Sequence, residues 1–325
     1  MKEVKILGIG SSVPQRVMTN EDLSKIVDTN DEWITTRTGI KERRISEGEN
    51  TSDLASKAAL NALEKAGLKP EDIDLIVLAT STPDALTPAT AVFVQEKIGA
   101  FNAACFDISA ACSGFIYALN TASQFIKTGQ SKAALVIGAD VLSKITDWTD
   151  RSTCVLFGDG AGAAVLVPSE EKGVTSLFNG ADGRKAGVLG INCVPVKNPF
   201  VTPEKIDDIK IFMDGREVFK FATSIILEAI DKVLKDSGLK IDDIKYIVPH
   251  QANYRIIEYA ARKLKLPEEK FFMNLQKYGN TSAASIPIAL DEMLDKGLIK
   301  KGDKLILVAF GAGLTWSAGL VEWQY

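Results

Sequence analysis

The chain has 325 residues, of which 46% are hydrophobic and 25% are charged, and its formal net charge is -4. This composition is that of a globular protein with room for one large core or two domains. The slightly acidic balance argues against nucleic acid as a partner, and the absence of any run of about 18 apolar residues argues against a membrane span.

The amino-terminal segment and the numbers of cysteines and histidines narrow the class of protein further. The segment MKEVKILGIG has no signal-peptide pattern, so we expect a cytoplasmic protein. The four cysteines have no CxxC spacing, and the chain contains a single histidine, His250. We therefore expect neither a metal site nor a disulfide framework.

The first predicted element is a buried strand at residues 4–10, followed by a loop. Gly8-Ile9-Gly10 in this strand resembles the start of a dinucleotide-binding fingerprint. Val13 stands where the third glycine belongs, and no acidic residue is evident at the ribose position. This interpretation is therefore disfavoured.

A repeated helix–strand unit comes next. A helix over residues 52–66, begun by Ser52 or Asp53 and ended by Gly67, leads into a strand at 73–80. A second helix over 228–237 ends at Gly238 and leads into a strand at 244–250. The segments GLKPEDIDLIVLA and GLKIDDIKYIVPH match at most positions, which indicates an internal repeat.

The repeat continues at the same phase through a second helix and strand in each half. Helices at 113–127 and 281–295 precede strands at 133–138 and 304–310, and each half closes with a glycine-rich, hairpin-like stretch. Counting back equally from Gly129 and Gly297 reaches Cys112 and Asn280. Alternating strands and helices predict an α/β fold of mainly parallel sheets in two related halves, 1–170 and 171–325, divided within residues 168–189. Equivalent loops of two such halves are expected to meet near a pseudo-twofold axis.

Cys112 lies in DISAACSGF, directly before a predicted helix. The helix dipole there would lower the pKa of a thiol, and backbone N–H groups of the turn could face a developing oxyanion. The small neighbours leave room for a ligand beside the sulfur. The alternative is a small buried cysteine at a helix start.

His250 follows a predicted strand, at the place that Ala79 holds in the other copy of the repeat. Ligand-binding groups gather at such strand ends, although a lone histidine is often structural. Asn280, in YGNTSAAS, could be an ordinary helix N-cap. The convergence of Cys, His and Asn at three loop ends favours a catalytic site.

Two further features can be interpreted either as purely structural or as functional. The stretch Phe310-Gly311-Ala312-Gly313 could bring a backbone N–H near a ligand or form only a tight turn. A local positive patch follows His250 and is either a solvated face or a docking site for an acidic partner. Its members are Arg255, Arg262, Lys263 and Lys265.

The segments DISAACSGF, PHQANYRI and YGNTSAAS, with DEWITTRTGIKERR and FGAGLTW, resemble β-ketoacyl-acyl carrier protein synthase III. This family contains the initiating condensing enzymes of type II fatty acid synthesis. The resemblance covers essentially the whole chain. It implies a thiolase-like fold with αβαβα layers, no cofactor, and a homodimer.

The resemblance also implies catalytic roles. Cys112 would be acylated by a primer acyl-CoA, and malonyl-acyl carrier protein would then lose carbon dioxide and attack the acyl-cysteine. His250 and Asn280 would stabilise the enolate. The backbone N–H groups of Cys112 and Ala312 would hold the oxyanion of the acyl step, although the family usually has glycine at position 312.

Binding roles follow from the same resemblance. Trp33, Arg37, Arg151 and Asn253 would bind CoA, with the tryptophan and arginines clasping the adenine. The acyl carrier protein would dock on Gln251, Ala252, Asn253, Tyr254 and Arg255. The acyl pocket would include Leu86, Thr87 and Phe157, and a threonine at position 87 suggests room for a longer or branched primer.

Relatives with the same fold use a different third residue. Elongating ketosynthases use two histidines, of which this chain has only one, and thiolases use a second cysteine, whereas Cys154 and Cys193 lie in the wrong motifs. Plant-type polyketide synthases share the Cys-His-Asn set but are usually longer between the cysteine and the histidine. A Cys-His-Asn hydrolase, or a catalytically silent protein that binds the carrier, would belong to a different functional class.

Overall fold

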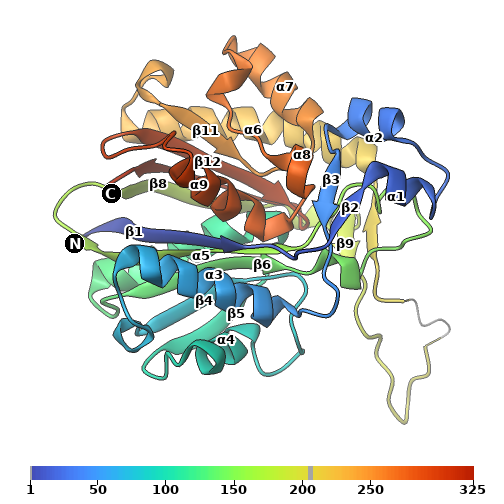
Figure 1. The fold of residues 1–325 in the computed structure, drawn as a ribbon, viewed down its shortest axis with the longest axis horizontal. Coiled ribbons are helices and arrows are strands. Elements are labelled where there is room, and N and C mark those ends of the chain that lie inside the picture. Colours follow the sequence, from blue (N-terminus) through green and yellow to red (C-terminus); the bar gives the residue numbers. More distant parts are fainter. Residues whose placement is uncertain (1, 204–207) are drawn as a thin grey trace.

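The computed structural model describes residues 2–203 and 208–325 as two sheets within five alternating layers of helices and sheets (Figure 1). The first sheet has the order β1-β7-β6-β4-β5, in which β4 is parallel to β5 and β6, whereas β7 is antiparallel to β1 and β6. Its strands are β1 (Glu3–Ser12), β4 (Leu75–Ala79), β5 (Ala104–Ile108), β6 (Ala134–Asp140) and β7 (Gly160–Ser169).

The second sheet repeats this arrangement. Its order is β8-β13-β12-β11, with β11 parallel to β12 and the other two pairs antiparallel. A parallel bridge between Ile247 and Phe271 takes the place that β5 holds in the first sheet. The strands are β8 (Val174–Ala181), β11 (Tyr246–Pro249), β12 (Lys304–Gly311) and β13 (Thr315–Glu322). The prediction of an α/β fold with two related, mixed sheets is confirmed.

Helices fill the other three layers (Figure 1). One outer layer holds α3 (Thr51–Ala66) and α4 (Thr90–Ile98), and the other holds α6 (Gly215–Ser237) and α7 (Tyr254–Leu264). The central layer consists of α5 (Gly114–Thr128) and α9 (Ser285–Asp295), which contact both sheets. The described part of the chain has no helix both long enough and apolar enough to cross a lipid bilayer.

Shorter elements surround one end of the layers. They are β2 (Val17–Thr19), α1 (Asn20–Ser24), α2 (Asp31–Thr38), β3 (Glu42–Arg44), β9 (Leu189–Ile191), β10 (Ile211–Met213) and α8 (Leu275–Tyr278). Single 3-10 turns lie at η1 (Pro70–Asp72), η2 (Ala111–Ser113), η3 (Leu142–Lys144), η4 (Gly183–Lys185), η5 (Ile241–Asp243), η6 (Glu268–Lys270) and η7 (Ser282–Ala284).

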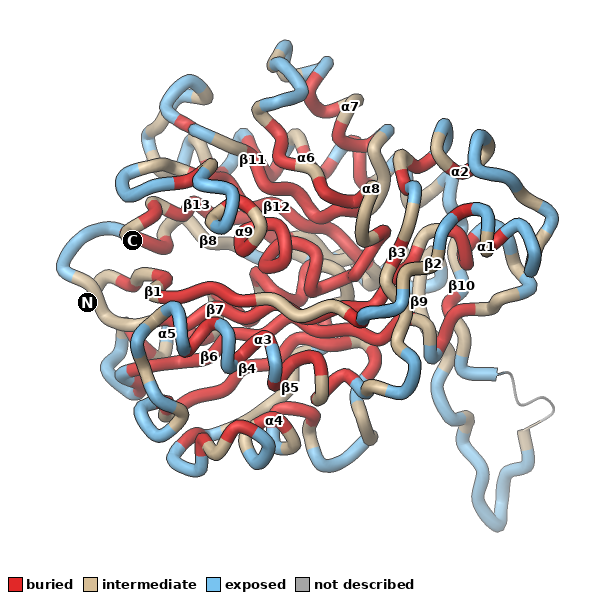
Figure 2. The backbone as a smooth tube through the Cα atoms, viewed as in Figure 1, coloured by how far each residue is buried: buried red, intermediate tan, exposed pale blue. Residues whose placement is uncertain are grey.

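The buried core follows the layers (Figure 2). Its central part combines α5 and α9 with the inner faces of both sheets, through side chains such as Phe115 and Leu290. The sheets approach these helices closely. A Cβ added at Gly138 in β6 would collide with the carbonyl oxygen of Ala283, so glycine at 138 lets η7 rest on the strand.

The repeat is visible in the backbone itself. Gly67 and Gly238 end α3 and α6 with φ of 66° and 71°. Lys69 and Lys240 then begin η1 and η5 with φ/ψ of -101°/158° and -99°/159°. The predicted duplication of this unit is therefore confirmed. The first sheet uses residues 3–169 and the second uses 174–322, but the central core draws on both, so a division at 170 and 171 stays a prediction.

The predicted pairing of Cys112 with Asn280 is wrong in register. Ala111 and Ser282 are the residues that begin η2 and η7, with matching positive φ values of 46° and 51°. By this match Cys112 corresponds to Ala283. Equal counting from the C-terminal glycines failed because α5 has 15 residues and α9 has 11.

Two predicted helix starts also needed correction. Asn50, and not Ser52 or Asp53, precedes α3, and its N–H donates to Asp53 Oδ2 at 2.8 Å in a capping box. Helix α6 begins at Gly215 rather than residue 228, because Asp214 Oδ1 caps it by accepting from the N–H groups of Arg216 and Glu217.

Candidate active site

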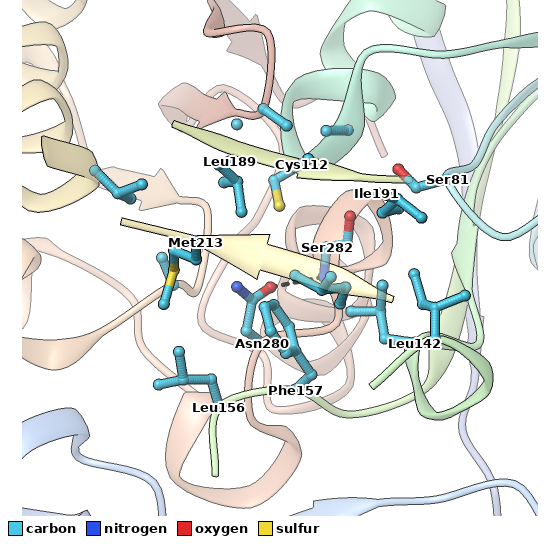
Figure 3. A pocket seen from close by; sticks show the side chains of 18 of the residues that line it. Ser81, Cys112, Leu142, Leu156, Phe157, Leu189, Ile191, Met213, Asn280 and Ser282 are labelled. Atoms are coloured by element: carbon cyan, nitrogen blue, oxygen red, sulfur yellow. Dashed lines mark hydrogen bonds between the residues drawn. The ribbon is translucent and has the colours of Figure 1, made fainter. Parts of the chain in front are cut away.

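One cavity of about 1010 Å³ is lined by Cys112, His250 and Asn280, which come from three separate elements. Cys112 lies in η2, His250 directly follows β11, and Asn280 lies two residues before the start of η7. In Figure 3 the sulfur of Cys112 points into the same space as Asn280. The structure therefore brings together the three side chains predicted to act on one substrate.

The turn that presents Cys112 is strained and tightly packed. Ala111 has a φ of 46°, a left-handed conformation that costs a non-glycine residue about 1 kcal/mol or more. Gly311 at the end of β12 packs against the turn, and a Cβ added there would lie 2.7 Å from the Cys112 nitrogen. This contact places the Gly311–Ala312 backbone beside the nucleophile turn.

The thiol of Cys112 does not have the lowered pKa that the helix dipole predicted. Its pKa is raised to about 12, chiefly by burial and to a smaller extent by the Asp140 carboxylate, while a hydrogen bond from the Ser282 hydroxyl opposes the rise. Cys112 is half-buried and lines the cavity. The raised pKa keeps its thiol protonated in the free protein at neutral pH.

Asp140 is a buried carboxylate that the sequence analysis missed. It ends β6 and accepts hydrogen bonds from Ser81 N (2.7 Å), Thr80 Oγ1 (3.1 Å), Thr82 Oγ1 (3.2 Å) and Ala283 N (3.3 Å). Burial raises the pKa of Asp140, and these hydrogen bonds oppose the increase. Asp140 thus joins the first sheet to η7, whose first residue, Ser282, lines the cavity.

His250 is held as a neutral ring. Only 2% of the residue is exposed, and burial lowers its pKa to about 3. Its Nδ1 lies 2.7 Å from Ser285 Oγ, and the edge of its ring meets Phe310 with centroids 5.6 Å apart. If the Ser285 hydroxyl donates to Nδ1, the proton is carried by Nε2, which makes Nε2 a donor.

The depressed pKa of His250 predicts acid destabilisation. The unfolded chain binds this proton below pH 6.5, whereas the folded protein resists it down to about pH 3, so this contribution to stability is lost as pH falls between those values. Between pH 7.5 and 4.5, wild type should lose about 3 kcal/mol more unfolding free energy than His250→Gln. Urea unfolding of both proteins at the two pH values measures the difference, and equal losses would contradict the prediction.

Asn280 is fixed by both its backbone and its side chain. Its N–H donates to Leu156 O at 2.8 Å, and its carbonyl accepts from Gly158 N at 3.0 Å. Its Oδ1 accepts from Ser282 N at 2.8 Å, and the amide nitrogen is turned away from this contact (Figure 3). Asn280 is thus not the N-cap of η7, a position that Thr281 holds, and its contact with Ser282 orients the NH₂ group as a donor toward the cavity.

Arg43, a fully buried arginine, supports the segment that pairs with Asn280. Its guanidinium donates to Val155 O (2.9 Å), Asn20 Oδ1 (2.9 Å) and Met18 O (3.2 Å), and burial lowers its pKa to about 10. The sequence signal was only an arginine in TGIKERR. Nothing in that pattern reveals that the charge is buried.

The residues predicted to bind CoA lie together at one side of the cavity. Trp33 and Arg37 of α2 line it, and Arg37 lies over the Trp33 ring with its Cζ 4.6 Å from the centroid. Arg151 approaches the same ring at 5.2 Å. Asn253 also lines the cavity, and its Oδ1 caps α7 by accepting from Arg255 N at 2.9 Å.

The predicted carrier-protein segment is only partly at the surface. Gln251 is 1% exposed, and its amide bonds internally to Pro249 O, Phe272 O and Asn274 N, so its placement in the docking surface was wrong. Ala252 lines the cavity instead, and Tyr254 is half-buried with its hydroxyl 2.9 Å from Glu268 Oε2. The exposed basic residues are Arg255, Arg262, Lys263 and Lys265.

The apolar part of the cavity was only partly predicted. Phe157 is buried in its wall, whereas Leu86 is 83% exposed at its edge and Thr87 is exposed on the same loop, so Thr87 does not form the pocket within a single chain. The sequence analysis missed the apolar side chains of β9 and β10: its predicted boundary at 168–189 included only the first residue of β9, and it predicted no element at β10. The missed lining residues include Leu142, Ile145, Leu156, Leu189, Ile191, Ile211 and Met213 (Figure 3).

Among residues 2–203 and 208–325, no group of three or more His, Cys, Asp or Glu side chains is placed to hold a metal ion.

The cavity brings together the thiol of Cys112, the neutral imidazole of His250, the amide of Asn280 and nearby backbone N–H groups. A buried sulfur beside neutral hydrogen-bond donors, at facing turns of two duplicated sheets, is the arrangement of condensing enzymes with the thiolase-like fold.

Comparisons with known proteins agree with this class. A family model described as 3-oxoacyl-[acyl-carrier-protein (ACP)] synthase III matches residues 106–183, and the model of its C-terminal part matches residues 234–323. The β-ketoacyl-[acyl-carrier-protein] synthase III of Clostridium acetobutylicum is 60% identical over 323 residues, which cover 99% of each chain. That of Clostridium novyi is 58% identical over the whole of both chains. The chain therefore belongs to the β-ketoacyl-acyl carrier protein synthase III family.

Solved structures give the same result. The 3-oxoacyl-[acyl-carrier-protein] synthase III from Aquifex aeolicus aligns with a TM-score of 0.92 at 50% identity, over 98% of this chain and 100% of that one. The priming β-ketosynthase of the R1128 polyketide pathway aligns with a TM-score of 0.93 at 36% identity, over 99% and 97%. The predicted family and the thiolase-like fold are confirmed, as is the prediction of an acyltransferase that begins fatty acid synthesis.

Proposed function

We propose that the chain condenses a primer acyl group from an acyl-CoA with malonyl-acyl carrier protein, by a ping-pong reaction through acyl-Cys112. The observation that carries this proposal is the single cavity in which Cys112 lies with His250 and Asn280. The neutral state of His250 supports a role as hydrogen-bond donor. So low a pKa does not suit a general base, which must take up a proton and carry a positive charge during the reaction.

In the first half-reaction, the sulfur of Cys112 attacks the thioester carbonyl of the acyl-CoA. The backbone N–H groups of Cys112 and Ala312 receive the oxyanion of the tetrahedral intermediate. The carbon–sulfur bond to CoA then breaks, and CoA leaves as the thiol with the proton that Cys112 gave up. Gly311 packs against the Cys112 turn and so brings the backbone of its neighbour Ala312 close to that of Cys112. This contact supports the pairing of the two N–H groups as donors.

In the second half-reaction, malonyl-acyl carrier protein binds to the acyl-enzyme. His250 Nε2–H and the Asn280 amide donate to its thioester oxygen, which stabilises the enolate formed as carbon dioxide leaves. The enolate carbon attacks the acyl carbonyl, and the bond to Cys112 breaks. The sulfur takes up a proton, and β-ketoacyl-carrier protein is released.

Substrate binding uses two different surfaces. The Trp33 ring with Arg37 and Arg151 forms a stacking and cationic site that suits the adenine of CoA. The exposed basic residues of α7 and Lys265, which follows it, form an electrostatic surface for the carrier protein, with Gln251 left out. The carrier's linker would pass Asn253 and Ala252 to reach the cysteine.

The primer's hydrocarbon chain would enter the apolar pocket around Phe157, Leu189 and Ile191. A second copy of the chain would cover exposed apolar side chains such as Leu86 and Phe200, of which 83% and 94% are accessible. Strand β5 lies at an open edge of its sheet and could pair with its copy. Homodimerisation, the absence of a cofactor and the cytoplasmic location stay predictions.

The proposed function is tested by supplying acetyl-, isobutyryl- and hexanoyl-CoA with malonyl-carrier protein and measuring both products. We expect one carbon dioxide for each β-ketoacyl-carrier protein, with a preference among primers that changes when Ile191→Trp fills the pocket. A variant on the far side of the fold, Leu60→Trp at an exposed position of α3, should leave the preference unchanged. Release of free fatty acid without carbon dioxide would show a hydrolase instead, and no acylation of Cys112 would show a silent binder.

A further inference from the structure

The hydroxyl of Thr315 lies between the two backbone segments that meet at Cys112. Thr315 begins β13, opposite Gly311 in β12, and lines the cavity. Its Oγ1 is 2.6 Å from Ser113 Oγ, 3.1 Å from Ala110 O and 2.9 Å from Ala312 O. One hydroxyl thus contacts residues on both sides of Cys112 in sequence, as well as the residue predicted to supply the other oxyanion donor.

The two hydroxyl hydrogens can be arranged in three ways. Ser113 can donate to Thr315, which then donates either to Ala312 O or to Ala110 O. Alternatively, Thr315 donates to Ser113, which donates to Ala110 O at 3.0 Å. Each arrangement ties the β12–β13 hairpin to the Cys112 turn, because each contains the hydrogen bond between Thr315 and the fully buried Ser113.

The packing on the other side of the hairpin explains why this hydroxyl matters. Gly311 lies against the Cys112 turn with no space for a side chain. That contact limits how near the hairpin can come, but van der Waals contact does not prevent it from moving away. The hydrogen bonds of Thr315 supply the restraint in the opposite direction.

We propose that Thr315 is a positioning residue, which sets the spacing between the N–H groups of Cys112 and Ala312 through its contacts with Ser113, Ala110 and Ala312. The inference rests on the proposed function, in which these two N–H groups hold the oxyanion. Both half-reactions pass through a tetrahedral intermediate at the same carbonyl, so both depend on this spacing. Asn280, in contrast, acts only in the second.

The test compares Thr315→Val, which keeps the shape but removes the hydroxyl, with Thr315→Ser, which keeps the hydroxyl. Single-turnover acylation of Cys112 by acyl-CoA and condensation from preformed acyl-enzyme are each measured. We expect Thr315→Val to slow both steps by similar factors of about 10 to 100 at saturating substrate, with the KM for acyl-CoA changed less than about threefold. Thr315→Ser should stay within about threefold of wild type in both steps.

Three outcomes would overturn the inference: wild-type rates in Thr315→Val, equal losses in Thr315→Ser and Thr315→Val, or a loss confined to KM. If Thr315→Val does not fold, Ser113→Ala serves instead, and it should slow both steps in the same direction. Unchanged rates in Ser113→Ala would then count against the proposal. The wild-type protein separates failure of this inference from failure of the proposed function. If wild type does not acylate Cys112, the proposed function is refuted, and the Thr315 contacts then only hold the β12–β13 hairpin against the Cys112 turn.

Discussion

Replacing Cys112 by alanine is expected to abolish acyl transfer from acyl-CoA, because Cys112 is the thiol that lines the cavity together with His250 and the Gly311–Ala312 backbone at the proposed oxyanion site. The loss should be at least about 10⁴-fold in the acylation rate, the scale seen when a nucleophile is removed. Intact-protein mass after incubation with acyl-CoA measures the result directly. Wild type should gain one acyl group and Cys112→Ala should gain none.

Cys193 provides the matched control for this experiment. Cys193 is exposed and also lines the cavity. It therefore offers the same thiol chemistry beside the same cavity, but it does not lie in the strained turn. Cys193→Ala should acylate at the wild-type rate. Acylation that survives in Cys112→Ala, or disappears in Cys193→Ala, would refute the assignment of the nucleophile.

Asn280→Ala is expected to separate the two half-reactions. Acylation should proceed within a few-fold of wild type, because the amide contacts neither the sulfur's turn nor the proposed acyl oxyanion site. Decarboxylation of malonyl-carrier protein should fall by about 10² to 10³, the cost of losing one donor to a developing oxyanion. Carbon dioxide release from preformed acyl-enzyme measures the second effect.

Asn253→Ala is the control for this variant, since Asn253 is another cavity-lining asparagine whose Oδ1 also accepts from a backbone N–H. It should alter substrate KM with little effect on the decarboxylation step. If Asn280→Ala instead lost acylation while preformed acyl-enzyme still released carbon dioxide normally, the role of the amide in enolate formation would be wrong. Circular dichroism and thermal unfolding check that the loss of the Ser282 contact has not disordered η7.

The surroundings of Cys112 bear on how it would be acylated. Because its pKa is raised to about 12, chiefly by burial, little of the thiol is present as thiolate in the free protein at neutral pH. In the proposed reaction, acylation would therefore depend on the bound acyl-CoA, whose thioester would be polarised by the backbone N–H groups of Cys112 and Ala312 as the sulfur approaches.

Local sequence determined much of this protein by itself. The glycines at 67, 129 and 238 end their helices because only glycine enters the left-handed conformation at low cost, and each is found at the predicted end. The duplicated segments after Gly67 and Gly238 predicted two like sheets, because equal patterns of apolar and turn residues fold alike. The small residues around Cys112 and the single histidine similarly restricted the candidates for chemistry.

Tertiary structure alone decided which groups surround those candidates and what state they are in. Cys112 was expected to have a lowered pKa from its helix, but burial raises the pKa, helped by the Asp140 carboxylate 28 residues along the chain. Gln251 was placed in a docking surface by its position in a motif, whereas its amide is used up by three internal hydrogen bonds. The acyl pocket and the Thr315 contact join residues that are far apart in sequence, so no local pattern records them: desolvation and contact depend on what the folded chain packs together.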